Sequence, residues 1–269
     1  MTSTRPVGDA EQVGEPAGRG PLASVLNAVA LLDTFSVAEP RLSVTEIARR
    51  IDLHKSTVSR LLGTLESVGL VERDGSTGHF GLGVGLLGLA GPLLAHLDVR
   101  KIAYPELGSL VETTSETCAL AVWSGHESIV VEQIPSPRQV KHTTPLGVRF
   151  TKVASASVQV FLAELPQSRV RSLLREGLIT ADGRDADAVL GELEAVRRDG
   201  LAVNDGDTDP EEFSVSAPIR DHRGLVAGAV LLSAPRARVT SFLADDYASR
   251  VRRCAGSVSA RLGGRVSEP

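Results

Sequence analysis

The stretch that decides the fold runs from Leu42 to Gly83 and reads LSVTEIARRIDLHKSTVSRLLGTLESVGLVERDGSTGHFGLG. Ser43 and Glu46 stand at the spacing of a capping box, which predicts that a helix begins directly after Ser43. Asp52 falls in a turn, where a short polar side chain tolerates a left-handed backbone. A second helix is expected from near His54. We therefore predict two short helices joined by a tight turn.

The second predicted helix has one apolar side. Its apolar residues recur at i, i+3, i+4, i+7 and i+10, so at about 100° per residue they gather on one face. These residues are Val58, Leu61, Leu62, Leu65 and Val68. Gly69 then ends the helix as a left-handed cap. Residues 70–73 and 79–82 flank the turn-forming residues 74–78, which predicts a β-hairpin. Two helices followed by such a hairpin make a helix-turn-helix with a wing.

The outer face of the second helix carries no acidic residue until Glu66. Hydroxyl groups and a helix N-terminus suit phosphate oxygens, and an arginine can pair in bidentate fashion with guanine. The alternative is a purely structural three-helix core whose polar residues face water. The helix pattern, the wing and the acid-free face coincide, which favours DNA binding. The contacts are expected from Lys55, Ser56, Thr57, Ser59, Arg60, Thr64 and Arg73.

A family resemblance follows from these residues. The segment EIARRIDLHKSTVSRLLGTLESVGLV, residues 46–71, is preceded by SVLNAVALLDTF, residues 24–35. Together they resemble the isocitrate-lyase-regulator (IclR) family of bacterial transcription factors, and the similarity covers nearly the whole chain beyond residue 20. The run K-S-T-V-x-R-L-L-x-T-L from Lys55 to Leu65 is its most specific part. Asp52 departs from the pattern, because the family usually has glycine at that turn.

Charge and composition are compatible with this prediction. The 269 residues are 42% hydrophobic, and the formal net charge is −4. A sequence-specific regulator needs only a local basic face, so this total does not exclude DNA binding. The positive surface is expected from Arg41, Arg49 and Arg50 as well as from Lys55, Arg60 and Arg73.

The expected compartment is the cytoplasm. Two cysteines give neither a disulfide framework nor a metal-ligand spacing. We expect no signal peptide, because the N-terminus lacks a basic region followed by an apolar core. Residues 82–97 are nearly free of charge, but glycines and Pro92 interrupt them, and they are shorter than the ~20 residues of a membrane span. A buried linker helix is the better prediction, with no membrane contact.

The chain divides into four expected regions. These are a disordered tail over residues 1–20, a winged helix-turn-helix DNA-binding domain over 21–83, a linker helix over 84–98 and an effector-binding domain over 99–264. Helices are predicted at 22–35, 85–99, 102–112, 153–164, 167–176, 185–199 and 240–262, and strands at 117–123, 128–134, 138–144, 201–204, 214–220 and 225–233. Hairpin strands with helices outside them predict an α+β fold. The resemblance implies a GAF-like α+β ligand-binding domain.

A second domain of this size suggests that DNA affinity is coupled to a small metabolite. The resemblance places the pocket between the sheet and the loop and helix of residues 152–159. Matched residue by residue, it implies effector contacts from Ser155, Ala156, Val158, Asn204, Ser214, Leu231 and Ser233. The alternative is that the hydroxyls of Ser155, Ser214 and Ser233 have no role in binding and are hydrogen-bonded to the backbone of a strand or a helix cap. Several of these positions are less polar than the family pattern, which favours an effector that is larger or more hydrophobic than a small keto acid.

The sequence offers weaker support for two other functions. Residues 83–88 match G-x-G-x-x-G, but the preceding strand is a short hairpin arm and no βαβ unit follows, so close helix packing is expected instead of a dinucleotide site. No catalytic signature is found, so we expect neither an enzyme, a cofactor nor a bound metal. The second alternative is a constitutive DNA-binding protein whose large domain only oligomerises.

The sequence therefore predicts an effector-responsive transcriptional repressor. Two protomers would present their recognition helices one duplex turn, ~34 Å, apart to a roughly palindromic operator in double-stranded DNA. Dimer contacts are expected from 22–35 and 85–97, where apolar surface exceeds what one small domain can bury. The resemblance also implies a homotetramer formed through the ligand domains.

Overall fold

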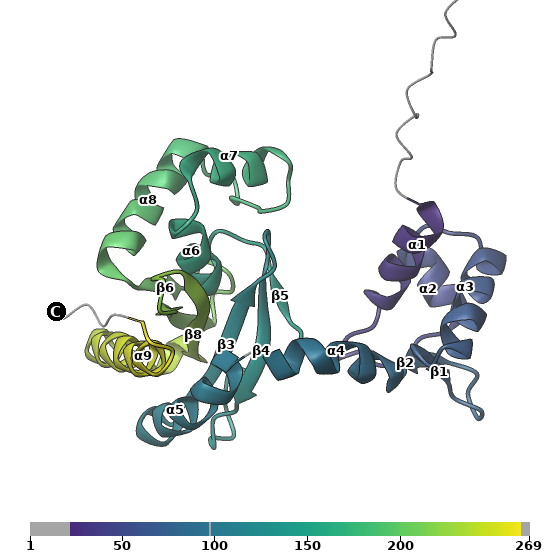
Figure 1. Ribbon diagram of the computed structural model, residues 1–269, viewed down its shortest axis with the longest axis horizontal. Coiled ribbons are helices and arrows are strands. Elements are labelled where there is room, and N and C mark those ends of the chain that lie inside the picture. The colour runs from purple at the N-terminus through teal and green to yellow at the C-terminus, as the bar shows by residue number, and fades with distance from the viewer. Residues whose placement is uncertain (1–21, 97, 265–269) are drawn as a thin grey trace, which may run out of the picture. The chain divides into compact units, whose positions relative to one another are not determined.

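The computed structural model describes residues 22–96 and 98–264, and the chain forms two compact units that divide after Pro92 (Figure 1). The tail expected over residues 1–20 lies outside the described residues. The first unit contains α1 (Ala23–Leu32), α2 (Val44–Arg50), α3 (Lys55–Ser67), β1 (Val71–Arg73) and β2 (Phe80–Leu82), and α4 (Gly85–His96) follows. No helix in the described part of the chain is long and apolar enough to cross a membrane.

The helix-turn-helix forms as the local signals predict. The Ser43 hydroxyl accepts from the Glu46 amide at 3.3 Å, and the Glu46 carboxylate accepts from the Ser43 amide at 2.8 Å, which completes the capping box. Asp52 occupies the turn with φ of 51°, and Gly69 ends α3 with φ of 75°. Both predicted left-handed positions are confirmed.

The core of the first unit lies between the three helices and the hairpin. Leu31, Ile47, Val58 and Leu62 are fully buried there. Val68 was predicted on the same apolar face, and this prediction is wrong, because its side chain is 61% exposed. The reason is that α3 ends at Ser67 and the Val68 backbone has already left the helical path.

The described part of the second unit is built around a six-stranded antiparallel sheet (Figure 1). The strands are β3 (Thr117–Trp123), β4 (Ser128–Ile134), β5 (Arg149–Phe150), β6 (Ala202–Asp205), β7 (Glu212–Arg220) and β8 (Val226–Pro235), in the order β5-β4-β3-β8-β7-β6. The helices are α5 (Asp98–Thr114), α6 (Ala156–Ala163), α7 (Gln167–Arg175), α8 (Ala186–Asp199) and α9 (Ser241–Arg261), with a 3-10 turn η1 (Arg236–Arg238) before α9.

Alternation along the strands assigns the two faces of the sheet. On β8, Val230 and Leu232 belong to the core shared with α5 and α9. Ala229 and Leu231 belong to the core shared with α6. A further apolar cluster joins α6 to α7 and α8, so these two helices cover α6 rather than the sheet. The α+β architecture predicted from the hairpins is confirmed.

The predicted strand at 138–144 is wrong, because those residues form an irregular loop. The β4 strand ends before Pro135, which has no amide hydrogen for a ladder. In the loop, backbone carbonyls are taken by side chains: the Thr117 hydroxyl donates to the His142 carbonyl at 2.6 Å, and Arg238 donates to the Val140 carbonyl at 2.9 Å. The strand that pairs with the other edge of β4, opposite β3, is instead β5.

Several element ends differ from the predicted ones. Helix α5 begins at Asp98, four residues earlier than predicted, and contains Pro105 in its interior. Helix α6 begins at Ala156 rather than at residue 153, because Val153 instead donates its amide to the Thr180 carbonyl at 2.9 Å. These shifts leave the order and type of the elements unchanged.

Candidate DNA-binding face and effector site

The seven residues predicted to bind DNA are all exposed. Lys55, Ser56, Thr57, Ser59, Arg60 and Thr64 lie on α3, and Arg73 lies at the end of β1 in the wing. The first turn of α3 contains no acidic residue. The apolar side of the same helix faces the core, so α3 presents a hydroxyl-rich and basic surface to solvent.

Some of these polar side chains already have hydrogen-bond partners within the protein. The Thr64 hydroxyl donates to the Arg60 carbonyl at 3.0 Å, so its hydrogen is used within α3. The Ser56 hydroxyl lies 2.7 Å from Nδ1 of His54, the residue that caps the helix. Sequence reasoning missed this cap, although the position directly before a predicted helix start was the place to look for one.

The wing is held in shape by its own turn. The Asp74 carboxylate accepts from the Ser76 amide at 2.8 Å and from the Thr77 amide at 3.1 Å. Hydrogen bonds from Ser76, first through its side chain, lower the pKa of Asp74 to about 2. The Arg73 guanidinium lies over the Phe80 ring at 5.6 Å, a cation-π contact that orients it.

Two of the expected basic residues are paired with acids. Arg41 contacts Glu72 at 2.7 Å, and Arg50 contacts Glu39 at 2.7 Å. The positive surface is therefore narrower than the count of basic residues suggests. Of the other expected basic residues, Lys55 and Arg60 lie on α3, Arg49 on α2 and Arg73 on β1.

The glycine-rich segment that resembles a dinucleotide loop has a packing role. The Gly85 amide donates to the Gly69 carbonyl at 3.0 Å. A Cβ atom would lie 2.3 Å from that carbonyl oxygen at Gly83 and 2.5 Å from it at Gly85. These two glycines let the chain pass close to the end of α3.

In the second unit, a row of buried polar side chains crosses four strands. Asn204 pairs with Ser214, Ser214 with Ser233, and Ser233 with Thr117. None of the four is more than 3% exposed. The Asn204 amide donates to the Ser214 hydroxyl at 3.2 Å. Because Ser233 alternates with Leu232, which faces α9, the row lies on the face covered by α6.

The Ser233 hydroxyl is buried and has no hydrogen-bond partner within the described residues. By contrast, the Ser216 hydroxyl donates to the Val230 carbonyl at 2.8 Å. A buried hydroxyl without a partner is costly and rare in proteins. This atom is the strongest local indication of a site that a ligand would complete.

The other predicted effector residues are placed in three ways. Leu231 and Ala156 share the apolar cluster between the sheet and α6. Ser155 lies beside Ser157, with 3.4 Å between the two hydroxyls. Val158 packs instead in the cluster that joins α6 to α7 and α8. The structure thus brings Asn204, Ser214 and Ser233 into one row and turns Val158 toward a different core.

The loop of residues 136–144 lies at the end of this row. Its His142 carbonyl is bonded to Thr117, and His142 Nε2 lies 3.9 Å from the Glu212 carboxylate. His142 Nδ1 is buried and, like Ser233 Oγ, has no partner in the described part of the chain. Sequence reasoning did not select His142, because the predicted strand would have placed it in a ladder.

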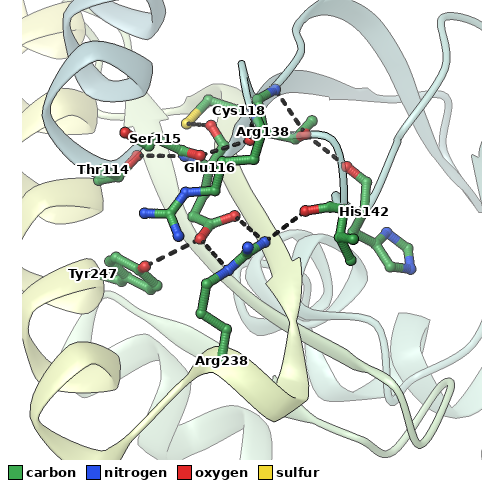
Figure 2. A network of polar contacts seen from close by, with 11 residues as sticks. Thr114, Ser115, Glu116, Cys118, Arg138, His142, Arg238 and Tyr247 are labelled. Carbon is green, nitrogen blue, oxygen red and sulfur yellow. Dashed lines mark hydrogen bonds and ion pairs between the residues drawn. The ribbon is translucent and has the colours of Figure 1, made fainter.

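A network around the buried carboxylate of Glu116 also contacts this loop (Figure 2). Glu116 is fully buried, its carboxylate lies 2.9 Å from Nε of Arg238, and the Tyr247 hydroxyl donates to it at 3.3 Å. Burial raises the pKa of Glu116, and the nearby Arg238 charge opposes this rise. Because Arg238 also donates to the Val140 carbonyl, the network joins η1, α9 and the loop.

The two units define a class of protein. An exposed basic recognition helix with a wing, followed by a separate α+β domain with a buried polar site, is the arrangement of a ligand-responsive DNA-binding regulator. The family models agree. Residues 24–75 match the IclR helix-turn-helix domain, and residues 92–260 match the C-terminal domain of bacterial IclR transcriptional regulators. The chain belongs to the IclR family and is a DNA-binding transcriptional regulator.

Known relatives cover nearly the whole chain. The transcriptional repressor IclR of Escherichia coli is 28% identical over 91% of this chain and 92% of its own length. A crystal structure of one domain (residues 129–302 of that protein) of an IclR-family transcriptional regulator is 47% identical, with a TM-score of 0.61 over 62% of this chain and 98% of that one. An IclR homologue from Microbacterium hydrocarbonoxydans, crystallised with 4-hydroxybenzoate, shares the fold at 24% identity, with a TM-score of 0.73 over 89% of this chain and 99% of that one.

Proposed function

We propose that this regulator is a repressor that binds a roughly palindromic operator as a homodimer and releases or tightens it when a small effector binds the second unit. Residues 21–83 would bind DNA, residues 84–98 would connect the domains, and residues 99–264 would bind the effector. The protein would act by binding rather than by catalysis, in the cytoplasm where its DNA lies.

The acid-free outer face of α3 is the observation that carries the DNA-binding part. Lys55 and Arg60 stand on it with exposed side chains, and the apolar side of the helix is fixed in the core. In a helix-turn-helix, the second helix lies in the major groove with its N-terminal residues at the base edges. Arg60 is proposed to read a guanine, and Lys55 to contact phosphate.

Exposed apolar side chains support a dimer. On α1, Val25, Leu26 and Val29 are each more than half exposed, and on α4, Leu87 and Leu89 are 67% and 68% exposed. Such a concentration of exposed apolar residues marks an interaction surface. We propose that these two helices form the dimer interface, with tetramers forming through the second units.

The effector is proposed to bind at the row of Asn204, Ser214 and Ser233. Among the residues that the structure describes, Ser233 Oγ and His142 Nδ1 have no hydrogen-bond partner. Leu231 and Ala156 supply apolar surface on the same side of the sheet. This combination suits a ligand with hydroxyl groups and an apolar body better than a small keto acid. The Microbacterium homologue, which was crystallised with 4-hydroxybenzoate, is in line with this chemistry.

The test uses the full-length chain. Duplexes would be selected from a random library, and the melting temperature would be followed across a panel of keto acids and hydroxylated aromatic acids. A true effector raises the melting temperature by mass action and changes the affinity for the selected duplex. A regulator that binds DNA but responds to no ligand would instead be a constitutive DNA-binding protein with an oligomerising domain. Failure to select any duplex would refute the DNA-binding proposal.

A further inference from the structure

The start of α3 holds an unusual cap. His54 lies directly before the helix with an extended backbone, and its ring nitrogen Nδ1 accepts from the Ser56 amide at 3.3 Å. Caps of this kind are ordinarily Ser, Thr, Asp or Asn, which end in an oxygen acceptor. A histidine differs from these residues because its ring has a second nitrogen, Nε2, in addition to the capping nitrogen Nδ1.

The cap determines where the ring hydrogen lies. To accept from the Ser56 amide, Nδ1 must be the bare nitrogen, so the hydrogen of the neutral ring is on Nε2. The Ser56 hydroxyl lies 2.7 Å from Nδ1. In this tautomer the hydroxyl is the donor of that contact, and it shares the single lone pair of Nδ1 with the Ser56 amide. Within the described residues, the hydrogen bonds of the His54 ring are made through Nδ1, and the residue is exposed.

These contacts make His54, rather than Ser56, the available hydrogen-bond donor at the start of α3. Phosphate oxygens only accept hydrogen bonds, and the hydrogen of Ser56 is already committed to His54. While it keeps this contact, Ser56 can accept a hydrogen bond, as from a base amino group, and it would have to break the contact in order to donate to a phosphate. His54, beside Lys55 and at the positive end of the helix dipole, has a donor available.

We propose that His54 is a DNA-backbone contact that donates from Nε2 to a phosphate, and that Ser56 faces the bases as an acceptor. The proposal rests on the DNA-binding function of α3 and adds to it a residue that the sequence pattern did not select. The interaction is a neutral N–H donor bonded to a charged oxygen. It fixes the position of the helix on the duplex and adds no base preference by itself.

Two variants separate the cap from the contact. His54→Asn places an amide oxygen where Nδ1 lies and so keeps the cap, but it ends short of the position of Nε2. His54→Gln reaches that position with an N–H donor but gives up the cap. We expect H54N to melt as the wild type does and to bind the selected duplex about three- to tenfold more weakly. We expect H54Q to melt at a lower temperature and to keep the phosphate contact.

The decisive measurement replaces single phosphates of the selected duplex by neutral methylphosphonates. At one phosphate in each half-site, the substitution should weaken wild-type binding about three- to tenfold and should have little effect on H54N. The inference is overturned if H54N binds as tightly as the wild type, or if every methylphosphonate penalty is the same in both proteins. If the wild type itself selects no duplex, the DNA-binding proposal fails. That result differs from the two outcomes that would overturn only the role of His54.

Discussion

The two units use hydroxyl groups in opposite ways. On α3, the hydroxyls of Ser56, Ser59 and Thr64 are exposed on a helix whose other side is buried. On the sheet, Ser214 and Ser233 are buried in a row that crosses several strands. The exposed set is adjacent in the sequence and shares a helical period, whereas the buried set becomes adjacent only through strand register. The first can be recognised from spacing alone, and the second requires the fold.

The cost of a change should therefore differ between the units. In the second unit, a substitution at a buried charge or hydroxyl affects a group that has lost access to water. On α3, it acts mainly through binding and leaves folding nearly unchanged. The following predictions test this contrast from the largest expected effect to the smallest.

Arg238→Ala should cost the most, because it leaves the buried Glu116 carboxylate without its main compensating charge. We expect a loss of about 3 kcal/mol in the free energy of unfolding at pH 8. Burial already raises the pKa of Glu116 above its ordinary value of 4.5, and the variant raises it further. An acid shifted upward destabilises the fold above its folded-state pKa, so the loss should shrink as the pH falls and Glu116 takes up a proton.

Urea unfolding followed by Trp123 fluorescence measures this loss, because the chain has a single tryptophan and Trp123 packs on Phe161 in the second unit. Arg236→Ala is the matched control. Its partner Asp205 is 58% exposed, and such surface pairs contribute at most about 1 kcal/mol. A loss for Arg238→Ala that is small and independent of pH would contradict the role assigned to Glu116.

Gly83→Ala should destabilise the first unit by about 3 kcal/mol, because its Cβ would collide with the Gly69 carbonyl oxygen. Gly88→Ala is the control, since a Cβ there meets nothing within 4 Å and alanine favours a helix. Hydrogen exchange of peptides that cover β1 and β2 measures the difference. Equal exchange in the two variants would show that the glycine pair has no packing role.

Arg60→Ala should weaken specific operator binding by about 1–3 kcal/mol and relax discrimination at one base pair. Lys55→Ala should instead weaken binding to all sequences alike and reduce the salt slope by about 1. Fluorescence anisotropy on selected and scrambled duplexes at several salt concentrations separates the two effects. Unchanged discrimination in the Arg60 variant would mean that the base-reading face is assigned wrongly.

Ser233→Ala should change the stability of the ligand-free protein by less than about 1 kcal/mol, because the hydroxyl has no hydrogen-bond partner in the described residues 22–96 and 98–264. It should nevertheless reduce the increase in melting temperature that an effector produces. Ser259→Ala makes the opposite control. That hydroxyl accepts from the Arg220 amide at 2.9 Å and donates to Ala255 at 2.7 Å, on the α9 side of the sheet. This variant should lose stability and keep the full effector response.

Local signals predicted the first unit well and the second unit unevenly. The capping box at Ser43 and the left-handed turn at Asp52 act within a few residues, so they are visible in the chain. The segment around His142 was predicted as a strand, but it forms a loop. Its carbonyls are bonded by Thr117 and Arg238, which are 25 and 98 residues away from their partners. No pattern within the segment contains that information.

The amino-acid sequence alone determined the winged helix-turn-helix, the face that α3 turns outward and the α+β character of the second unit. Helical period, capping residues and turn residues are short-range causes, and they act in the same way wherever the segment lies. Only the tertiary structure decided that Asn204, Ser214 and Ser233 form one buried row and that Val158 faces another core. Strand register and side-chain direction are set by packing between distant segments, and this is the reason that the sequence pattern could not assign them.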